Sequence, residues 1–150
     1  MIQIVKVFAA LLLVLAGAAV AGETRGTPEE ARTMVARAIA AYDAQGKSAF
    51  PAMTAPGTEF RDRDLYVFVA GPDNLTVAHG LDASLIGRDL AQILDSAGKA
   101  FGKEIIDKAD EKGVWVDYAW RDPLTGKDIQ KSSWVVRHDG YIFGCGIYKP

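Results

Sequence analysis

Cysteine and histidine are scarce in this 150-residue sequence, which contains one cysteine, Cys145, and two histidines, His79 and His138. A single cysteine cannot form an internal disulfide, so a disulfide-stapled scaffold is excluded and the fold must depend on a hydrophobic core. The sequence has no Cys-x-x-Cys or His-x-x-x-His spacing and no complete calcium loop. We therefore expect no bound metal and no cofactor.

Runs of basic residues are also missing, because no two Lys or Arg residues are adjacent anywhere in the chain. The 17 Lys and Arg residues are balanced by 19 Asp and Glu residues, which gives a formal net charge of −2. Proteins that bind a phosphate backbone concentrate positive charge on one face or stripe. We therefore expect no nucleic-acid partner.

Only one long apolar run is present, at residues 7–21, which follow Lys6 and end in Ala19-Val20-Ala21. A basic residue, a short apolar stretch and a small-residue end are typical of a cleaved signal peptide. The alternative is an inner-membrane anchor formed by residues 7–21, but a membrane-spanning helix needs about 20 apolar residues and this run is shorter. We expect cleavage after Ala21, export to the periplasm, and one domain over residues 22–150.

The first element of that domain is predicted to be a long helix. Thr27 is a helix cap, Pro28 suits the first helical position, and Glu30 lies three residues after the cap. Apolar residues then recur at helical spacing as far as Tyr42. Gly46 is expected to end the helix, and a short second helix is predicted over Lys47 to Thr54.

After residue 57 the hydrophobic period changes to about two, which indicates strands. A hairpin is predicted from residues 65–70 and 75–79, followed by a connecting segment, a helix over Phe101 to Lys112, and strands at 114–121, 129–137 and 141–148. This order is typical of an α+β fold in which an antiparallel sheet of about five to six strands is covered by helices.

Amphipathic residues concentrate on two of these strands. Tyr118 and Trp120 share one face of strand 114–121, and Lys131 and Ser133 share one face of strand 129–137. We expect a register that places Trp120 opposite Lys131 and Tyr118 opposite Ser133, because a cation, a phenol, an indole and a hydroxyl then converge on an apolar floor. Such a set suits a small anion. The alternative is that Tyr118 and Trp120 are core aromatics and Lys131 is a surface residue.

The remaining candidates are His79 and Cys145. His79 ends the second strand of the hairpin, where a lone histidine is either a structural hydrogen bonder or a ligand contact. Cys145 lies between Gly144 and Gly146 in a strand, where a small buried thiol is common. Catalysis by Cys145 would need a nearby histidine as its base. The buried structural role is favoured over this pair, so we expect no catalytic residue.

Seven short motifs, taken in order, resemble the single Cache domains (Cache type 2) of bacterial extracytoplasmic sensors. They are Tyr66-Val67-Phe68-Val69, Ala78-His79-Gly80, Leu85-Ile86-Gly87-Arg88-Asp89-Leu90, Asp95-Ser96-Ala97-Gly98-Lys99, Val116-Asp117-Tyr118-Ala119-Trp120 with Pro123, Lys131-Ser132-Ser133, and Gly144-Cys145-Gly146-Ile147-Tyr148. The resemblance spans Thr27 to Tyr148. It implies a PAS-like fold with a long N-terminal helix on one side of the sheet and, on the other, a pocket for small ligands, often short carboxylic acids.

The resemblance also implies which residues bind the ligand. The tyrosine and tryptophan of the family's Tyr-x-Trp strand match Tyr118 and Trp120, its following lysine matches Lys131, and its strand-end histidine matches His79. The family often has an aromatic residue where this chain has Ser133, and a proline where it has Gly80. Both departures touch the pocket and therefore bear on the size of the ligand.

The function that these observations favour is non-enzymatic binding of a small organic anion, such as a C2–C4 carboxylate, by His79, Tyr118, Trp120, Lys131 and Ser133. Cache domains usually belong to membrane chemoreceptors or kinases, whereas this sequence ends at Pro150, shortly after the last predicted strand. We therefore expect a stand-alone sensor module that presents its ligand to a membrane receptor, kinase or transporter. The alternative is a protein–protein assembly module whose pocket is vestigial.

Overall fold

The protein is described by a computed structural model, and residues 24–149 are the part of it described below, so the expected signal peptide lies outside the described residues. A capping box starts the first helix, α1 (Pro28–Gln45), as predicted: the Thr27 hydroxyl accepts the amide of Glu30, and the Glu30 carboxylate accepts the amide of Thr27. Gly46 ends α1 with a positive φ of 60°, a conformation that favours glycine.

The other elements follow in a helix–sheet–helix–sheet order. They are the 3₁₀ turn η1 (Gly46–Ala49), α2 (Phe50–Thr54), β1 (Arg61–Asp62), β2 (Leu65–Ala70), β3 (Thr76–His79), the 3₁₀ turns η2 (Ala83–Leu85) and η3 (Leu90–Gln92), α3 (Phe101–Lys108), β4 (Val114–Arg121), β5 (Asp128–His138) and β6 (Tyr141–Lys149). The predicted α+β class and the predicted hairpin are confirmed.

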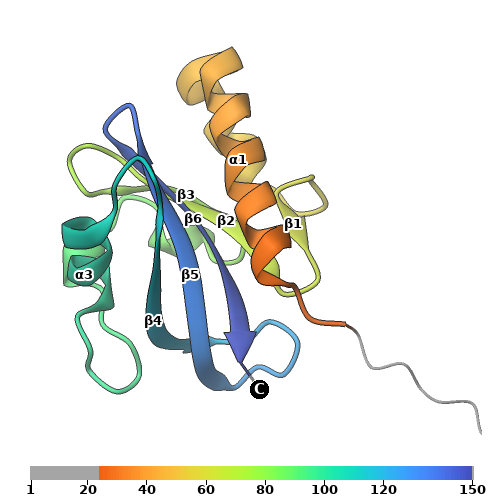
Figure 1. Ribbon diagram of the computed structural model, residues 1–150, viewed down its shortest axis with the longest axis vertical. Helices are drawn as coiled ribbons and strands as arrows, with labels where there is room; N and C mark the ends of the chain where they lie inside the picture. The colour runs from red at the N-terminus through yellow and green to blue at the C-terminus, as the bar shows by residue number, and fades with distance from the viewer. Residues whose placement is uncertain (1–23, 150) are drawn as a thin grey trace, which may run out of the picture.

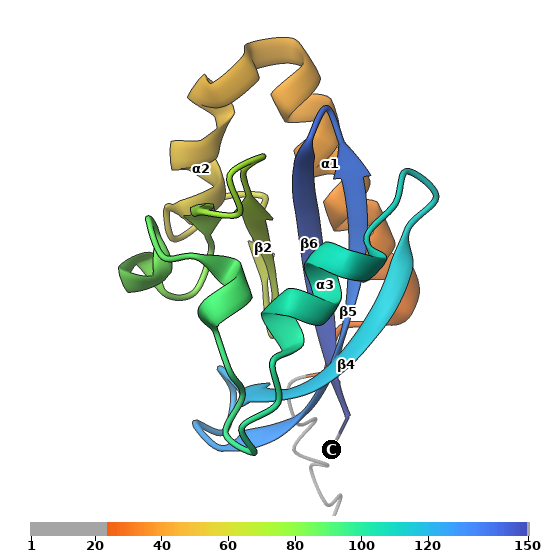
Figure 2. The same ribbon diagram turned by 90° about the vertical axis from the view of Figure 1, so that its left-hand side faces the viewer.

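The strands form one antiparallel sheet in the order β1-β2-β6-β5-β4, and β3 pairs with β2. Helix α1 covers one face of the sheet and α3 lies on the other, as Figures 1 and 2 show from two directions. Each face has its own core: Val67, Phe143 and Cys145 pack with α1 residues, whereas Phe68, Tyr118 and Ile142 pack with Phe101 and Ile105 of α3. The sheet therefore separates two hydrophobic compartments.

Two helix predictions need correction. The predicted helix over residues 47–54 is a 3₁₀ turn followed by the short α2. The predicted helix over residues 101–112 ends at Lys108, because the Asp110 carboxylate accepts the amides of Lys112 and Gly113 at 2.9 and 2.8 Å and turns the chain. Two carbonyls near the end of α3 then accept hydrogen bonds from the Arg137 side chain. The two-residue strand β1 was not predicted.

The predicted register of β4 and β5 is wrong by two residues. Tyr118 pairs with Lys131, and Trp120 pairs with Ile129. The reason lies in the connecting loop, where the Asp122 carboxylate accepts the Leu124 amide and the Thr125 hydroxyl, and the Asp122 amide bonds the Lys127 carbonyl. These hydrogen bonds close the loop so that Arg121 pairs with Asp128, whereas the expected register requires a longer connection between the two strands. A shift of two residues keeps side chains on the same face, so the predicted grouping on one face is retained.

Candidate functional site

The α3 face of the sheet carries a row of large polar side chains across four adjacent strands. Tyr118 of β4 pairs with Lys131 of β5, and Lys131 pairs in turn with Tyr148 of β6. Val67 of β2 pairs with Cys145 of β6 in an antiparallel register, so the preceding residue, Tyr66, lies beside Gly146. Three phenols therefore surround one amine.

Gly146 of β6 gives the Lys131 side chain its path across the sheet. A Cβ atom at this position would lie 2.2 Å from Lys131 Cε and 2.4 Å from Ser133 Oγ. Such distances are far below van der Waals contact, so only glycine leaves the lysine stem room at this position. Gly144 acts in the same way for the Phe68 ring, which lies 2.1 Å from where a Cβ would be. The two glycines that flank Cys145 in a continuous strand are therefore explained by packing on this face.

The Lys131 amine is buried, with 1% of the residue exposed, and it donates a hydrogen bond of 2.6 Å to the Tyr66 hydroxyl. It also lies 3.9 Å from the centre of the Tyr66 ring and 5.0 Å from that of Tyr148, distances typical of cation–π contacts. Within residues 24–149 no carboxylate forms a salt bridge with it. Burial lowers its pKa from 10.5 to about 7. An anion placed beside this amine would restore its charge.

The hydrogen bonds of the surrounding tyrosines run in one direction. Tyr148 donates to the Arg121 carbonyl at 2.6 Å, which leaves its oxygen to accept from Tyr66 at 3.0 Å, and Tyr66 in turn accepts from Lys131. Burial raises the pKa of both phenols, so they remain neutral. An ammonium group has three N–H donors, and within residues 24–149 Lys131 uses one of them, the bond to Tyr66.

A small cavity of about 20 Å³ lies beside this row, between the sheet and the segment from η2 to α3. Its volume holds about one water molecule. Its lining is mostly apolar and includes Phe68, Thr76, His79, Leu85, Leu90, Ile93, Phe101, Tyr118 and Trp120. Apolar walls with few polar groups are typical of small-molecule sites.

His79 presents one edge of its ring to the backbone. Its Nδ1 accepts the amides of Leu81 at 3.3 Å and Asp82 at 2.9 Å, so the proton of the neutral ring is on Nε2. Within residues 24–149, Nε2 makes no hydrogen bond. Burial, with the Lys131 charge as a second cause, lowers the pKa of His79 to about 3. His79 is therefore a neutral donor toward the cavity.

Tyr118 is fixed from two sides. Its hydroxyl lies 2.8 Å from Ser133 Oγ, and the Phe101 ring of α3 stacks on its ring at 4.0 Å with an angle of 9°. Ser133 is fully buried and holds Tyr118 from the sheet side. Burial raises the pKa of Tyr118, which keeps it a neutral hydroxyl.

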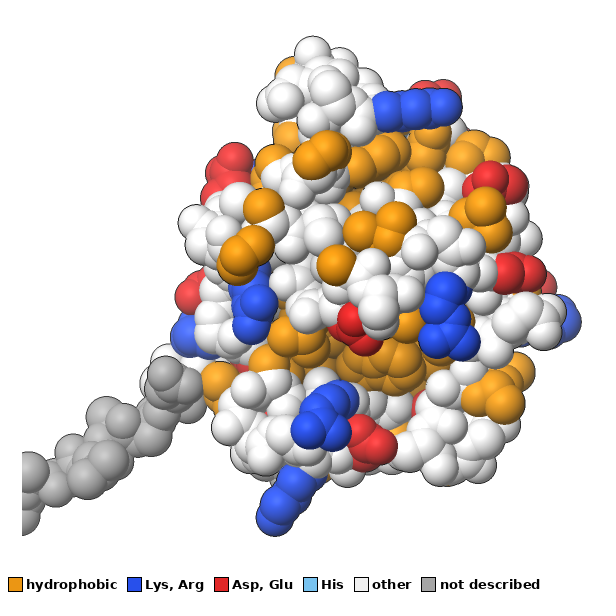
Figure 3. Space-filling view, turned by 180° about the vertical axis from the view of Figure 1, so that it is seen from behind, with side chains coloured by type: hydrophobic (Ala, Val, Ile, Leu, Met, Phe, Trp, Pro, Cys, Tyr) orange, Lys and Arg blue, Asp and Glu red, His pale blue; other side chains and the backbone are white. Residues whose placement is uncertain are grey.

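Trp120 borders two spaces. It lines the small cavity, and it also lines an open cleft of about 740 Å³ with Arg61, Asp82, Asp95 and other residues. Figure 3 shows a hollow with an apolar floor and a charged border on the face behind β5. Trp120 is half-buried and lines both the cavity and the cleft.

The family profile described as "Single Cache domain 2" matches residues 16–148. The chain belongs to this family. Cache domains are extracytoplasmic sensory modules that bind ligands and are not enzymes. Among curated proteins, no match to this chain is found.

Three solved structures have the same Cache fold. A methyl-accepting chemotaxis protein from Vibrio parahaemolyticus aligns with a TM-score of 0.65 and 18% identity, covering 80% of this chain and 86% of that one. A structure titled "Structural basis for carboxylic acid recognition by a Cache chemosensory domain" aligns at 0.59 and 19%, covering 81% and 88%. A periplasmic sensor domain of a chemotaxis protein aligns at 0.55 and 23%, covering 81% and 90%. The PAS-like arrangement implied by the sequence is thereby confirmed.

The structure brings the five predicted Cache site residues close together in different roles. His79, Tyr118 and Trp120 line the cavity, Ser133 lies behind Tyr118, and Lys131 lies in the adjoining tyrosine cluster. The alternative of a surface Lys131 is wrong. Tyr66, Tyr148 and Phe101 were not predicted as site residues, and their strand or helix patterns alone do not distinguish them from core.

Cys145 lies on the opposite, α1 face of the Cache sheet. Its thiol is buried and donates to the Met34 sulfur at 3.7 Å, and burial raises its pKa to about 12. Such a thiol is a poor nucleophile, so the geometry gives no support to a Cys145–His pair. In the described part of the chain, no helix is both long and apolar enough to cross a membrane, and no group of metal-ligating side chains is assembled.

Proposed function

We propose that this Cache domain binds a C2–C4 carboxylic acid without chemical change to it. The observation that carries this proposal is the buried Lys131 amine, which has two unused donors and no carboxylate partner within residues 24–149. A desolvated cation is costly unless an anion pairs with it. A ligand carboxylate meets that requirement, and one structural neighbour is described by its title as recognising carboxylic acids.

The neighbouring side chains complete the proposed site. Lys131 supplies the charge, Tyr118 and the Nε2–H of His79 supply hydrogen bonds, Trp120 forms an apolar wall with a donor, and Ser133 holds Tyr118 in place. Because the cavity holds about one water, a bound acid requires the segment from η2 to α3, or Trp120, to move outward.

The proposed setting is the periplasm, reached through a signal peptide at residues 1–21 that is cleaved after Ala21. There the domain would present its ligand to a membrane receptor, kinase or transporter. Family membership and the chemoreceptor neighbours support this setting.

The test is a thermal-shift screen of residues 22–150 against acetate, propionate, pyruvate, lactate, succinate and amino acids. A ligand at about 100 times its dissociation constant stabilises the folded state by about 2.7 kcal/mol, which raises Tm by roughly 5–10 °C. Lys131→Met should remove the shift, whereas Lys149→Met, at a half-exposed lysine, should keep it. Propionamide, a neutral analogue of propionate, should have no effect. A Lys131→Met protein that binds as tightly as wild type would contradict the assignment.

A second candidate function, an assembly module, has one observation in its favour. The cavity is nearly filled, while Leu75, Ile86 and Leu94 are 37%, 44% and 53% exposed. No response to any acid from a well-folded sample, together with a mass that rises with concentration in analytical ultracentrifugation, would favour this function over ligand binding.

A further inference from the structure

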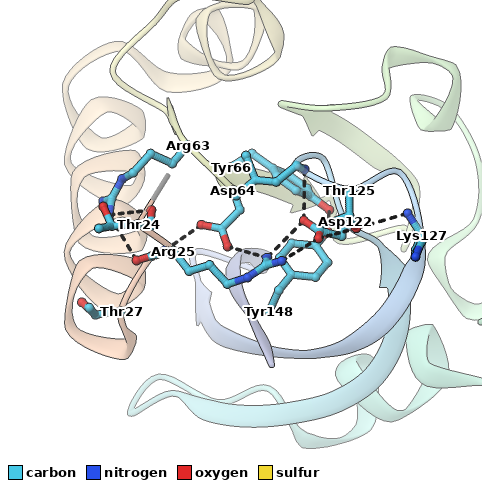
Figure 4. A network of polar contacts seen from close by, with 12 residues as sticks. Thr24, Arg25, Thr27, Arg63, Asp64, Tyr66, Asp122, Thr125, Lys127 and Tyr148 are labelled. Carbon is cyan, nitrogen blue, oxygen red and sulfur yellow. Dashed lines mark hydrogen bonds and ion pairs between the residues drawn. The ribbon is translucent and has the colours of Figure 1, made fainter. Parts of the chain in front are cut away.

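A buried charge cluster lies where the segment before α1 meets the sheet. Asp64 and Asp122 are both fully buried, and the Arg25 side chain lies between them. Arg25 donates to Asp64 at 3.2 Å and to the two oxygens of Asp122 at 3.2 and 2.8 Å, and the Gly26 amide donates to Asp64 at 2.7 Å. Figure 4 shows the three side chains side by side.

This cluster adjoins the tyrosines that surround the Lys131 amine. Asp64 comes two residues before Tyr66, and Asp122 directly follows Arg121, whose carbonyl accepts the Tyr148 hydroxyl. Figure 4 shows Tyr66 and Tyr148 next to both carboxylates. Burial lowers the pKa of Lys131, and Cys145 and then Asp64 act in the opposite direction and raise it.

The cluster holds two carboxylates and one guanidinium, so its net charge is −1. Arg25 also holds the pKa of Asp122 at about 2, which keeps that carboxylate ionised. Counting both carboxylates as ionised, the formal charge of the cluster without Arg25 is −2, close to the place where an anion is proposed to bind. Charges in a protein interior interact over longer distances than in water because screening is weak.

We propose that Arg25 is a positioning residue for anion binding: by pairing with Asp64 and Asp122, it limits the negative charge behind Tyr66 and Tyr148 and so sets the affinity of the site. This inference rests on the proposed function. Coupling between two sites is reciprocal, so a bound anion also stabilises the docked state of residues 24–27. The ligand site is thereby linked to the segment that connects α1 to the first 23 residues.

The test is a charge series, with propionate as the probe and calorimetry at pH 6 as the assay. The formal charge of the cluster is −2 in Arg25→Gln, −1 in wild type, and 0 in both Asp64→Asn and the triple variant Arg25→Gln/Asp64→Asn/Asp122→Asn. We expect Arg25→Gln to weaken propionate binding about tenfold, and both neutral clusters to bind at least as tightly as wild type. Arg63→Gln is the matched control, because Arg63 contacts the same segment through the Arg25 carbonyl but pairs with exposed Glu30 and Asp62.

If Arg25→Gln is unfolded, propionate binding by Asp64→Asn and by the triple variant tests the inference instead. Neither of these two variants leaves a buried charge without a partner in the cluster. Weaker binding in both neutral variants, or unchanged binding in a folded Arg25→Gln, would overturn the inference. A purely structural role for Arg25 predicts instead that the triple variant is as defective as the single one.

A readout without ligand separates this inference from the proposed function. Carbon-13 NMR of the Lys131 Cε follows the titration of the amine. This amine lies against the rings of Tyr66, Tyr118 and Tyr148 and interacts electrostatically with Cys145, His79 and Asp64. The midpoint should rise in Arg25→Gln and fall in Asp64→Asn. If it moves as expected but no acid binds, the charge coupling stands and the proposed ligand is wrong. If it moves in neither variant, Arg25 does not act on the site.

Discussion

Replacing Lys131 by methionine should make the protein more stable, by an amount that depends on pH. The side chain is buried without a carboxylate partner in the described chain, and methionine has a similar length and no charge. Replacing a buried charge by an apolar residue is often stabilising, whereas removing an ordinary core side chain is destabilising. The sign of the change therefore tests whether Lys131 is an uncompensated cation.

The size of the effect follows from the pKa of Lys131, which burial lowers from 10.5 to about 7. Below pH 7 the lysine is charged in both the folded and the unfolded state, so the full desolvation cost is present. Between pH 7 and 10.5 the unfolded state binds more protons than the folded state, so the wild-type protein gains stability as pH rises. At about 1.4 kcal/mol per pH unit, the gain from pH 7 to pH 9.5 is about 3 kcal/mol.

The assay is urea unfolding of wild type and Lys131→Met at several pH values from 6 to 9.5. The advantage of the variant should be largest at pH 6 to 7 and should shrink by about 3 kcal/mol by pH 9.5. The difference between the two proteins cancels the titration of Tyr66, Tyr118 and Tyr148, which both contain. Lys149→Met, at a half-exposed lysine paired with Asp117, should show no such trend. A difference that is flat with pH, or a variant less stable than wild type throughout, would refute the reasoning.

Two further predictions concern the same lysine. Propionate affinity should fall by up to tenfold per pH unit as pH rises above about 7, because the anion binds protonated Lys131 and the free protein must then take up a proton. Calorimetry at pH 6 and 8.5 measures this change. Equal affinity at the two pH values would contradict the prediction. Gly146→Ala should lower the free energy of unfolding in urea by roughly 1–3 kcal/mol and also weaken propionate binding, because the alanine Cβ would displace the Lys131 side chain. The control Gly46→Ala, at a position with open space around it, should lose stability without any change in propionate binding.

The elements that were predicted correctly are specified by residues close together in the sequence, without help from distant parts of the chain. Thr27, Pro28 and Glu30 specify the start of α1 through three separate hydrogen-bonding or steric preferences, and the structure has the complete capping box. The end of α3 was missed because it depends on a competing local bond from Asp110 and on Arg137, which is distant in sequence. Helical periodicity contains no information about such a distant partner.

The site was predicted in part for a similar reason. Alternation along β4 and β5 placed Tyr118, Lys131 and Ser133 on one face, and any register shifted by an even number of residues preserves that result. The register itself depends on the Asp122 loop, whose hydrogen bonds are visible only in three dimensions. Tyr66 was missed because β2 is buried along its whole length, so alternation could not show which of its faces is special.

The burial that lowers the stability of the ligand-free protein is also what makes the site selective. At neutral pH and below, the charged Lys131 costs the folded state several kcal/mol, because among residues 24–149 the amine contacts phenols and forms no salt bridge with a carboxylate. An anion that reaches the amine removes most of that cost. The stability that the ligand-free protein loses through the buried charge is thereby recovered on binding and adds to the binding free energy. A neutral ligand of the same shape gains nothing from this term. The preference for an acid over its amide therefore should disappear in Lys131→Met, even if the cavity still admits both.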